Sequence, residues 1–362
     1  MTLNEDSTFK FGCGRYHQEK NAIEAYLKEE AERFGKRAFI LAGENGYRVA
    51  HEKIANALRG SAVSYEFRLF HSLPCPANAE DLKKEIEAGG FDLVIGVGGG
   101  VLMDQAKLLA HFANLPLIQI PTSSATCAAV TPLSVMYDRD TGKTLGSLKL
   151  PKEADAVLVD LEILVRQPLR LFAAGVMDAM AKKIEIEHFV LFIPPEKMII
   201  GLDYAYQLAC TTTSHLESMT DSVLEDMKEG KISHAFNRLI FDTVAVTGII
   251  SGISKNQNQT AIAHRFYEEC RSFFPVETRP FLHGELVALG LLVQTEYNDL
   301  DPAPILRELK HMKLPASLSE IGIDPQKGME VFSRELCRSN VIDNVSPASL
   351  ARVQSALSVI AK

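Results

Sequence analysis

The chain has 362 residues, of which 46% are hydrophobic and 23% are charged, and its formal net charge is −8. This composition is that of a globular protein with enough chain for two domains and a large core. The dispersed negative charge argues against nucleic acid as a partner, because binding its phosphates needs a basic surface.

Short apolar runs and helical patterns alternate in the first half of the chain. Strands are expected at 37–43, 61–70, 92–97, 116–122 and 156–160, and helices at 52–60, 79–89 and 101–114. Because strands that alternate with helices across short loops form βαβ units, this pattern predicts a parallel sheet with helices on both faces.

The second half loses the strand signal and shows helical periodicity instead. Helices are expected at 172–192, 202–227, 233–254, 259–274 and 283–299. The change of pattern predicts two domains: a Rossmann-like α/β dinucleotide-binding domain over residues 1–163 and an all-α domain over 164–362. A cleft between them is the expected place for a ligand.

Neither a disulfide framework nor a targeting or membrane segment is expected. The six cysteines are scattered without a CxxC pair, which fits a reducing compartment. The N-terminal MTLNEDSTFK lacks the basic and apolar regions of a secretory signal. No run of about 18 apolar residues, the length that crosses a bilayer, is found. We therefore expect a cytoplasmic protein without a membrane partner.

Three consecutive glycines, Gly98, Gly99 and Gly100, join an apolar strand to a helix. Glycines allow close approach to the backbone, and a helix start attracts anions. The stretch fits neither GxGxxG nor Walker A, so a phosphate site and a plain turn stay equally open. Asp104, on the first turn, either caps the helix or faces a ligand, and Lys107 could pair with it.

A second loop, residues 120–138, is rich in small and hydroxyl side chains and follows the next strand. Loops at the carboxyl ends of parallel strands bind ligands, and hydroxyls there can bond ribose, phosphate or a carboxamide. The alternative is a solvent loop held by side-chain-to-backbone bonds. Cys127, in its middle, is interpreted as a small buried hydrophobe rather than a nucleophile.

Three residues of the predicted helices, Asp178, His264 and His283, have apolar or small neighbours in the sequence. One carboxylate and two imidazoles leave a divalent ion an open position, as in catalytic metal sites. Their spacing alone favours histidines satisfied within the core over a metal site.

Four stretches, in this order, resemble the iron-containing (group III) alcohol dehydrogenases. They are IGVGGGVLMDQAK, IPTSSATCAAVTPLSVMY, AAGVMDAMAKKIE and FLHGELVALGLLVQ. The resemblance is strongest to the glycerol dehydrogenase-like branch of that family. The family's fold, the dehydroquinate synthase-like architecture, joins an α/β nucleotide domain to a helical domain, in agreement with the two patterns of this chain.

The resemblance implies an NAD- or NADP-dependent alcohol dehydrogenase with a small-molecule substrate and one divalent ion, zinc in most of that branch, with iron as the alternative. The metal ligands it implies are Asp178, His264 and His283. The cofactor-binding residues it implies are Gly98, Gly99, Gly100, Val101, Leu102, Asp104, Thr122, Ser123, Ala125, Thr131, Leu133 and Tyr137. Because members of the family assemble into dimers and octamers, we also expect a homo-oligomer.

Two departures from the glycerol enzymes concern the substrate. Cys127 stands where they carry an aspartate that bonds polyol hydroxyls. Arg279 lies four residues before His283, where the sequence of the glycerol enzymes is neutral. A guanidinium there could bind both oxygens of a substrate carboxylate. The alternative is an arginine exposed on the surface. Both departures resemble the hydroxycarboxylate dehydrogenase subgroup. We therefore expect a small 2-hydroxy or 2-oxo acid, with glycerol dehydrogenase or glycerol-1-phosphate dehydrogenase activity as the alternative.

Cofactor preference and the competing classes rest on fewer residues. The strand that ends at Gly43 lacks the aspartate that often bonds the ribose of NAD, but Glu44 could replace it, so NAD and NADP both stay open. Dehydroquinate synthase-like cyclases are the competing class of enzyme with this architecture. They need a cluster of basic residues and normally a glutamate in place of Asp178, so Asp178 and the few basic residues around the motifs argue against them. A binding protein with a decayed site would lack a metal ligand, and none is missing here.

Overall fold

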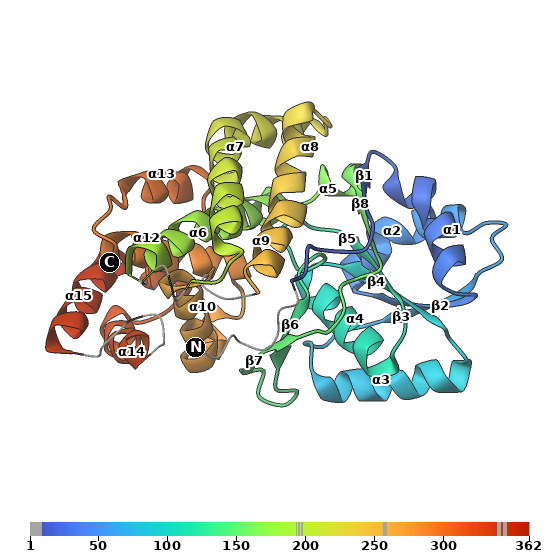
Figure 1. Cartoon of the computed structure of the whole chain (residues 1–362), viewed down its shortest axis with the longest axis horizontal. Coiled ribbons are helices and arrows are strands. Elements are labelled where there is room, and N and C mark those ends of the chain that lie inside the picture. The colour runs from blue at the N-terminus through green and yellow to red at the C-terminus, as the bar shows by residue number, and fades with distance from the viewer. Residues whose placement is uncertain are drawn as a thin grey trace.

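The structure is a computed structural model that describes residues 9–361, except 193, 195, 197, 256–258, 339–341 and 343–345. Six parallel strands form one sheet in the order β1-β8-β5-β4-β2-β3. They are β1 (Tyr16–Glu19), β2 (Arg37–Ala42), β3 (Ser64–Leu69), β4 (Leu93–Gly98), β5 (Leu117–Pro121) and β8 (Ala156–Asp160). The predicted parallel sheet is confirmed, and Figure 1 shows it in one half of the molecule.

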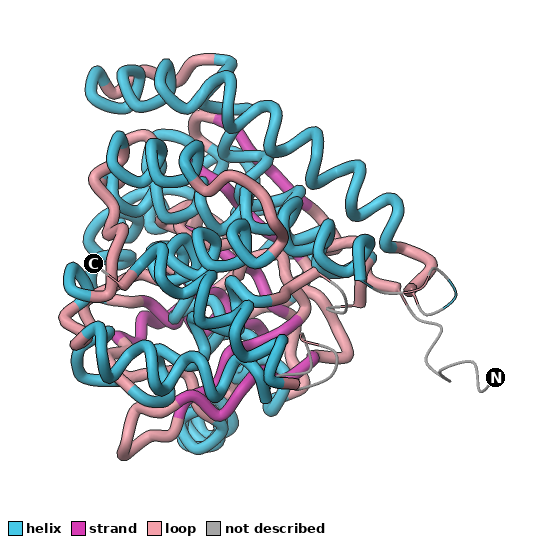
Figure 2. Tube along the Cα trace, turned by 90° about the vertical axis from the view of Figure 1, so that its left-hand side faces the viewer, coloured by secondary structure: helices cyan, strands magenta, loops and turns pink. Residues whose placement is uncertain are grey.

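Helices cover both faces of this sheet because successive strand residues point to opposite sides. Ile40 and Ile95 pack in one core with α1 (Ala22–Phe34) and α2 (Glu44–Ala57). Their neighbours Leu41 and Val94 belong to a second core, with α3 (Pro76–Gly89) and α4 (Gly100–Ala113). Figure 2 shows strands enclosed by helices from the side. This is the arrangement of a doubly wound α/β sheet.

A two-stranded antiparallel hairpin, β6 (Leu133–Tyr137) and β7 (Thr144–Lys149), lies outside the main sheet and was not anticipated from the sequence. Side chains of α4 and the hydroxyl of Ser134, which donates to the Asp104 carbonyl at 2.9 Å, tie it to that helix. Lys107 donates to the backbone oxygens of Thr131 and Leu133. Asp104 accepts from the backbone N–H of Val135, on β6 itself. These bonds hold the hairpin beside the carboxyl ends of the strands.

Every regular element that the structure describes after Asp160 is a helix, as predicted. The elements are α5 (Leu161–Leu164), α6 (Leu169–Phe192), α7 (Leu202–Glu229), α8 (His234–Ile240), η2 (Phe241–Val246), α9 (Thr247–Ile253), α10 (Ile262–Phe273), α11 (Pro275–Thr278), α12 (His283–Tyr297), α13 (Ala303–His311), η3 (Ser319–Ile321), α14 (Pro325–Arg338), α15 (Pro347–Leu357) and η4 (Ser358–Ile360). In Figure 1 they make up the other half of the molecule, with α6, α10 and α12 packed together. The domain division at residue 163 stays a prediction.

Within the described residues, one helical run, His234–Ile253, is long and apolar enough to cross a membrane. Polar residues such as Arg238 and Asp242 interrupt its apolar positions, so the sequence shows no uninterrupted apolar run here. Since 78% of its most apolar window is buried inside the protein, it has the surroundings of a core helix.

Candidate active site

A cleft of about 940 Å³ lies between the carboxyl ends of the sheet strands and the helical half. It brings together sequence-predicted residues from both halves of the chain. They are Gly98, Gly99, Gly100, Val101, Leu102, Asp104, Thr122, Ser123, Ala125, Cys127, Thr131, Leu133, Tyr137, Asp178, His264 and His283. Of the candidate site residues, Arg279 alone is not in the lining. The position of this cleft agrees with the ligand site expected between the two halves.

The three glycines form a sharp connection between β4 and α4. The strand ends at Gly98, Gly99 precedes the first turn in an extended conformation, and the helix begins at Gly100. Close packing explains two of them: a Cβ on Gly98 would lie 2.9 Å from the Leu102 side chain, and one on Gly100 would lie 2.7 Å from Thr126 Oγ1. A helix N-terminus open to a cleft is a suitable site for a phosphate.

Asp104 does not cap α4, because the helix begins after Gly99 without a side-chain cap. Its Oδ2 instead accepts from Val135 N–H at 3.2 Å, and Lys107 Nζ lies 2.8 Å from its Oδ1. Burial raises the pKa of Asp104, although Lys107 opposes this shift. The capping alternative was therefore wrong. Asp104 lines the cleft and also binds the hairpin through Val135.

The hydroxyl-rich loop is partly held by its own hydrogen bonds, as the alternative interpretation proposed. Thr131 Oγ1 donates to the Cys127 carbonyl at 3.0 Å. Gln167 bonds both the backbone N–H and the hydroxyl of Ser124. Thr122 and Ser123 are half-buried and line the cleft. The loop therefore has a defined shape, with part of its polar surface directed to the cleft.

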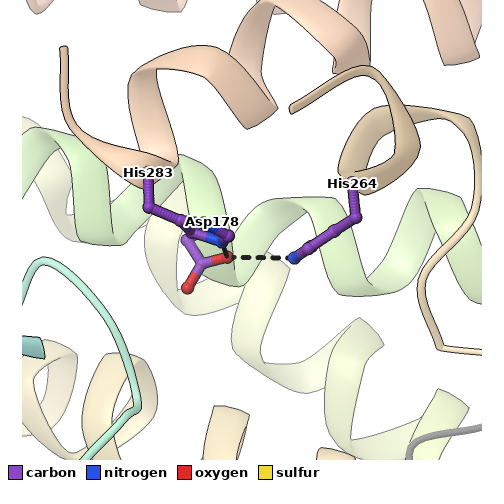
Figure 3. A group of neighbouring side chains, drawn as sticks. All are labelled: Asp178, His264 and His283. Carbon is purple, nitrogen blue, oxygen red and sulfur yellow. Dashed lines mark ion pairs between the residues drawn. The ribbon is translucent and has the colours of Figure 1, made fainter. Parts of the chain in front are cut away.

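Three helices bring the predicted metal ligands to one point. Asp178 comes from α6, His264 from α10 and His283 from the first position of α12. Asp178 Oδ1 is 3.4 Å from His264 Nε2 and 3.3 Å from His283 Nε2. One donor atom of each residue lies within 4.8 Å of the other two. Figure 3 shows the carboxylate directed toward both imidazoles.

These residues fit a divalent ion by their chemistry and by a missing contact. Asp178 Oδ1 is buried, and no hydrogen bond to it is found among the described residues. Burial acts to raise the pKa of Asp178, but His283, His264 and Lys182 outweigh it and hold the pKa well below its usual value. A buried carboxylate that stays charged and faces two imidazole nitrogens is a donor set that zinc and iron(II) accept.

Glu185, which the sequence analysis missed, orients His264. Its Oε2 lies 2.5 Å from His264 Nδ1, and its Oε1 accepts from the backbone N–H groups of Ala261 and His264 at 2.6 and 2.9 Å. With Nδ1 as the donor, the lone pair of Nε2 faces Asp178. The available signal was its spacing: seven residues after Asp178, it lies on the same face of α6.

His283 is held in place through the start of α12. Glu285 Oε2 accepts from the backbone N–H of Leu282 at 2.8 Å, and Arg170 of α6 binds both Glu285 oxygens at 2.5 and 2.7 Å. The Tyr267 ring packs edge-on against the His283 imidazole, with ring centroids 4.2 Å apart. A buried glutamate thus contacts the imidazole of His264, and a second one fixes the helix start that carries His283.

Arg279 is not brought to the triad. It is exposed and follows the short helix α11. Arg271 binds the carbonyls of Thr278 and Phe281, which fixes the turn on both sides of Arg279. This position agrees with the surface-arginine alternative. The cation that does reach the triad is Lys182, whose Nζ is 3.4 Å from His264 Nε2 and to which the sequence analysis gave no role.

A nucleotide-type sheet edge and a candidate metal triad that face one cleft are the arrangement expected of a metal-dependent dehydrogenase. The model of the family described as iron-containing alcohol dehydrogenase matches residues 13–161. The chain is also 30% identical to a glycerol dehydrogenase of Thermotoga maritima over 317 residues, which are 86% of this chain and 84% of that protein. The chain belongs to the iron-containing alcohol dehydrogenase family.

Two further comparisons agree with this family. Hydroxycarboxylate dehydrogenase A of Escherichia coli (strain K12) is 32% identical over 241 residues, which are 66% of this chain and 65% of that protein. The crystal structure of glycerol dehydrogenase from Schizosaccharomyces pombe superposes with a TM-score of 0.83 and 23% identity over 98% of this chain and 90% of that one, which shows the shared fold. Membership of the family implies an alcohol dehydrogenase that uses NAD(P) and a divalent metal ion.

Proposed function

We propose that this enzyme transfers a hydride between NAD(P) and a small 2-hydroxy or 2-oxo acid. The observation that carries the proposal is the thiol of Cys127 in the cleft wall. Burial, with a contribution from Asp178, raises its pKa to about 11, so this thiol is neutral near pH 7. A neutral thiol is a poor acceptor for polyol hydroxyls. The similarity to a relative named hydroxycarboxylate dehydrogenase A supports the same substrate class.

The residues of the sheet edge would hold the dinucleotide. The N-terminus of α4 after Gly99 would bind the pyrophosphate through backbone N–H groups. Leu133 and Tyr137 would contact the nicotinamide from the hairpin. The hydroxyls of Tyr137 and Tyr267 are 3.0 Å apart, which joins the hairpin to α10. Burial raises the pKa of both tyrosines, so both stay neutral phenols and can share this hydrogen bond.

Asp178, His264 and His283 would hold the divalent ion, which supplies Lewis-acid polarisation of the substrate oxygen when it is bound. The contribution of the chain is to fix these ligands before the substrate arrives. The contact of Glu185 with Nδ1 favours the His264 tautomer that leaves the Nε2 lone pair for the ion. Zinc is the ion we expect, with iron(II) as the alternative for this donor set. A cytoplasmic homo-oligomer also remains our expectation.

Steady-state kinetics with zinc-loaded enzyme test the proposal. We expect kcat/KM for 2-oxobutanoate to exceed that for dihydroxyacetone by at least about tenfold with NADH or NADPH. Titration of both reduced cofactors gives the cofactor preference in the same experiment. Activity with glycerol and dihydroxyacetone, but none with 2-oxobutanoate, would refute the acid substrate and support the alternative that relatives named glycerol dehydrogenase suggest.

A further inference from the structure

Lys182 is a buried cation in the wall of the cleft next to the metal triad. The residue is only 3% exposed, and it lines the cleft together with Asp178, four residues earlier on α6. Residues four apart share one face of a helix, so both side chains point to the same end of the cleft. The ammonium is 3.4 Å from His264 Nε2. Lys182 thus adjoins the place where the substrate carbon must react.

Among the residues that the structure describes, the ammonium of Lys182 has no carboxylate partner. In the described parts of the chain, no carboxylate oxygen lies within ion-pair distance of its Nζ. Asp178 faces the histidines, and both oxygens of Glu185 are occupied by His264 and backbone N–H groups. Asp178 and Glu185 attract the ammonium only from beyond ion-pair distance. Because a buried charge is stabilised best by a direct partner, this arrangement leaves a place for an anion from a ligand.

Two other enclosed lysines show how this chain normally pairs such charges. Lys107 lies 2.8 Å from Asp104. Lys53, which lines the cleft at the nucleotide side, contacts the carboxylates of Glu24, Asp160 and Glu162 at 3.1 to 3.2 Å. Lys182 differs from both, which is expected of a residue whose partner arrives with the substrate.

The position beside the triad restricts the kind of anion. In a 2-oxo acid the carboxylate is bonded directly to the reacting carbon, so a group that binds it must lie next to the metal ligands. A phosphate ester such as glycerol 1-phosphate carries its charge several bonds away and needs a more distant cation. A divalent ion at the triad would also repel the ammonium unless an anion lies between them.

We propose that Lys182 binds the substrate carboxylate and thereby selects 2-oxo and 2-hydroxy acids over uncharged ketones and polyols. This inference rests on the proposed function, since it concerns the specificity of the same site. It replaces Arg279 by Lys182 as the residue that recognises the acid group. The contact is a charge-assisted hydrogen bond within a largely enclosed site, which is the stronger kind of polar contact.

The test compares Lys182→Met with Lys183→Met. Lys183 is the matched control because it is the next residue on α6, is half-exposed and lies outside the cleft lining. It pairs with Glu187 at 3.6 Å. Kinetics are measured with 2-oxobutanoate and with 1-hydroxybutan-2-one, in which an uncharged hydroxymethyl group replaces the carboxylate. Calorimetry with oxamate, an unreactive carboxylate analogue, measures binding to the NADH complex without turnover, and elemental analysis measures the metal content.

We expect Lys182→Met to lower kcat/KM for 2-oxobutanoate by about 10- to 100-fold, chiefly through KM, and to weaken oxamate binding similarly. The rate with 1-hydroxybutan-2-one should change less than about threefold. Lys183→Met should behave like the wild type in every measurement. Lys182→Arg, which keeps the positive charge, should recover part of the oxamate affinity.

The outcomes separate this inference from the proposed function. If the wild type does not reduce 2-oxobutanoate, the proposed function fails and Lys182 loses its role with it. If the wild type reduces it, but Lys182→Met impairs both substrates equally or loses the metal, Lys182 acts in proton transfer, packing or metal retention and the inference is overturned. Should Lys182→Met not fold, Lys182→Gln replaces it, and unchanged oxamate affinity in that variant also refutes the inference.

Discussion

Replacement of Glu185 by glutamine tests whether this buried carboxylate controls metal binding. Glu185 makes three contacts in the structure, and the one to His264 Nδ1 is 2.5 Å long. Glutamine keeps an oxygen for the backbone N–H groups of Ala261 and His264 but would direct an amide N–H against the N–H of Nδ1. The imidazole must then move its proton to Nε2 or rotate, and either change removes the lone pair that faces Asp178.

The expected size follows from this geometry. Loss of a carboxylate that orients a ligating histidine lowers metal affinity by about 10- to 100-fold. This corresponds to about 1.4–2.7 kcal/mol of binding free energy. Burial alone would raise the pKa of Glu185, but His264 and Lys182 hold it below its usual value, so the carboxylate that glutamine replaces is charged near pH 7.

Zinc affinity is measured by competition with a chromophoric chelator on the purified apo-protein. Glu187→Gln is the matched control, because Glu187 lies two residues after Glu185 on α6. It contacts Lys183 and Tyr206 rather than the triad. We expect wild-type affinity for Glu187→Gln and reduced affinity for Glu185→Gln. Equal zinc affinity of Glu185→Gln and the wild type would refute the argument that Glu185 sets the tautomer of His264.

Three further predictions concern other parts of the site. Gly284→Ala should lower the free energy of unfolding by about 1–3 kcal/mol or more in a urea titration. The reason is that its Cβ would lie 1.9 Å from the Ala174 carbonyl oxygen where α12 meets α6. An unfolding midpoint equal to that of the wild type would contradict this close packing. Cys127 should react slowly with iodoacetamide at pH 8 and faster as the pH approaches its pKa of about 11, since the thiolate is the nucleophile. Mass spectrometry follows the reaction. Rapid labelling of the native protein at pH 7 would show that the thiol is not buried. Arg279→Ala should change KM for 2-oxobutanoate by less than about twofold, because this side chain is exposed and outside the cleft; a large rise in KM would return the acid-binding role to Arg279.

The regular elements were predictable where local pattern and final packing agree. The strand at 156–160 was predicted with its observed ends, because its first four residues are apolar and all five are buried. The helix expected at 52–60 was placed too late, since α2 spans Glu44–Ala57. Gly46 in its first turn resembles a helix breaker, but a Cβ there would lie 2.5 Å from the Val97 carbonyl oxygen. Packing against β4 therefore requires a residue that helix propensity disfavours.

The hairpin of β6 and β7 escaped detection for a related reason. Its strands have irregular exposure, so neither shows the alternation of a half-buried strand. The contacts that hold it come from Asp104 and Lys107, which precede it in the chain by a whole strand and loop. Interactions of this kind leave no periodic signal in the segment that they stabilise.

The sequence by itself determined the parallel sheet, the helical second half, the glycine turn and the residue types of the metal site, because these depend on short-range spacing. Only the tertiary structure decided that Asp178, His264 and His283 meet and that Lys182, not Arg279, accompanies them. Helical periodicity puts Asp178, Lys182 and Glu185 on one side of α6, but the packing of α10 and α12 decides what that side faces. Such packing joins segments far apart in the chain, and no local pattern records it.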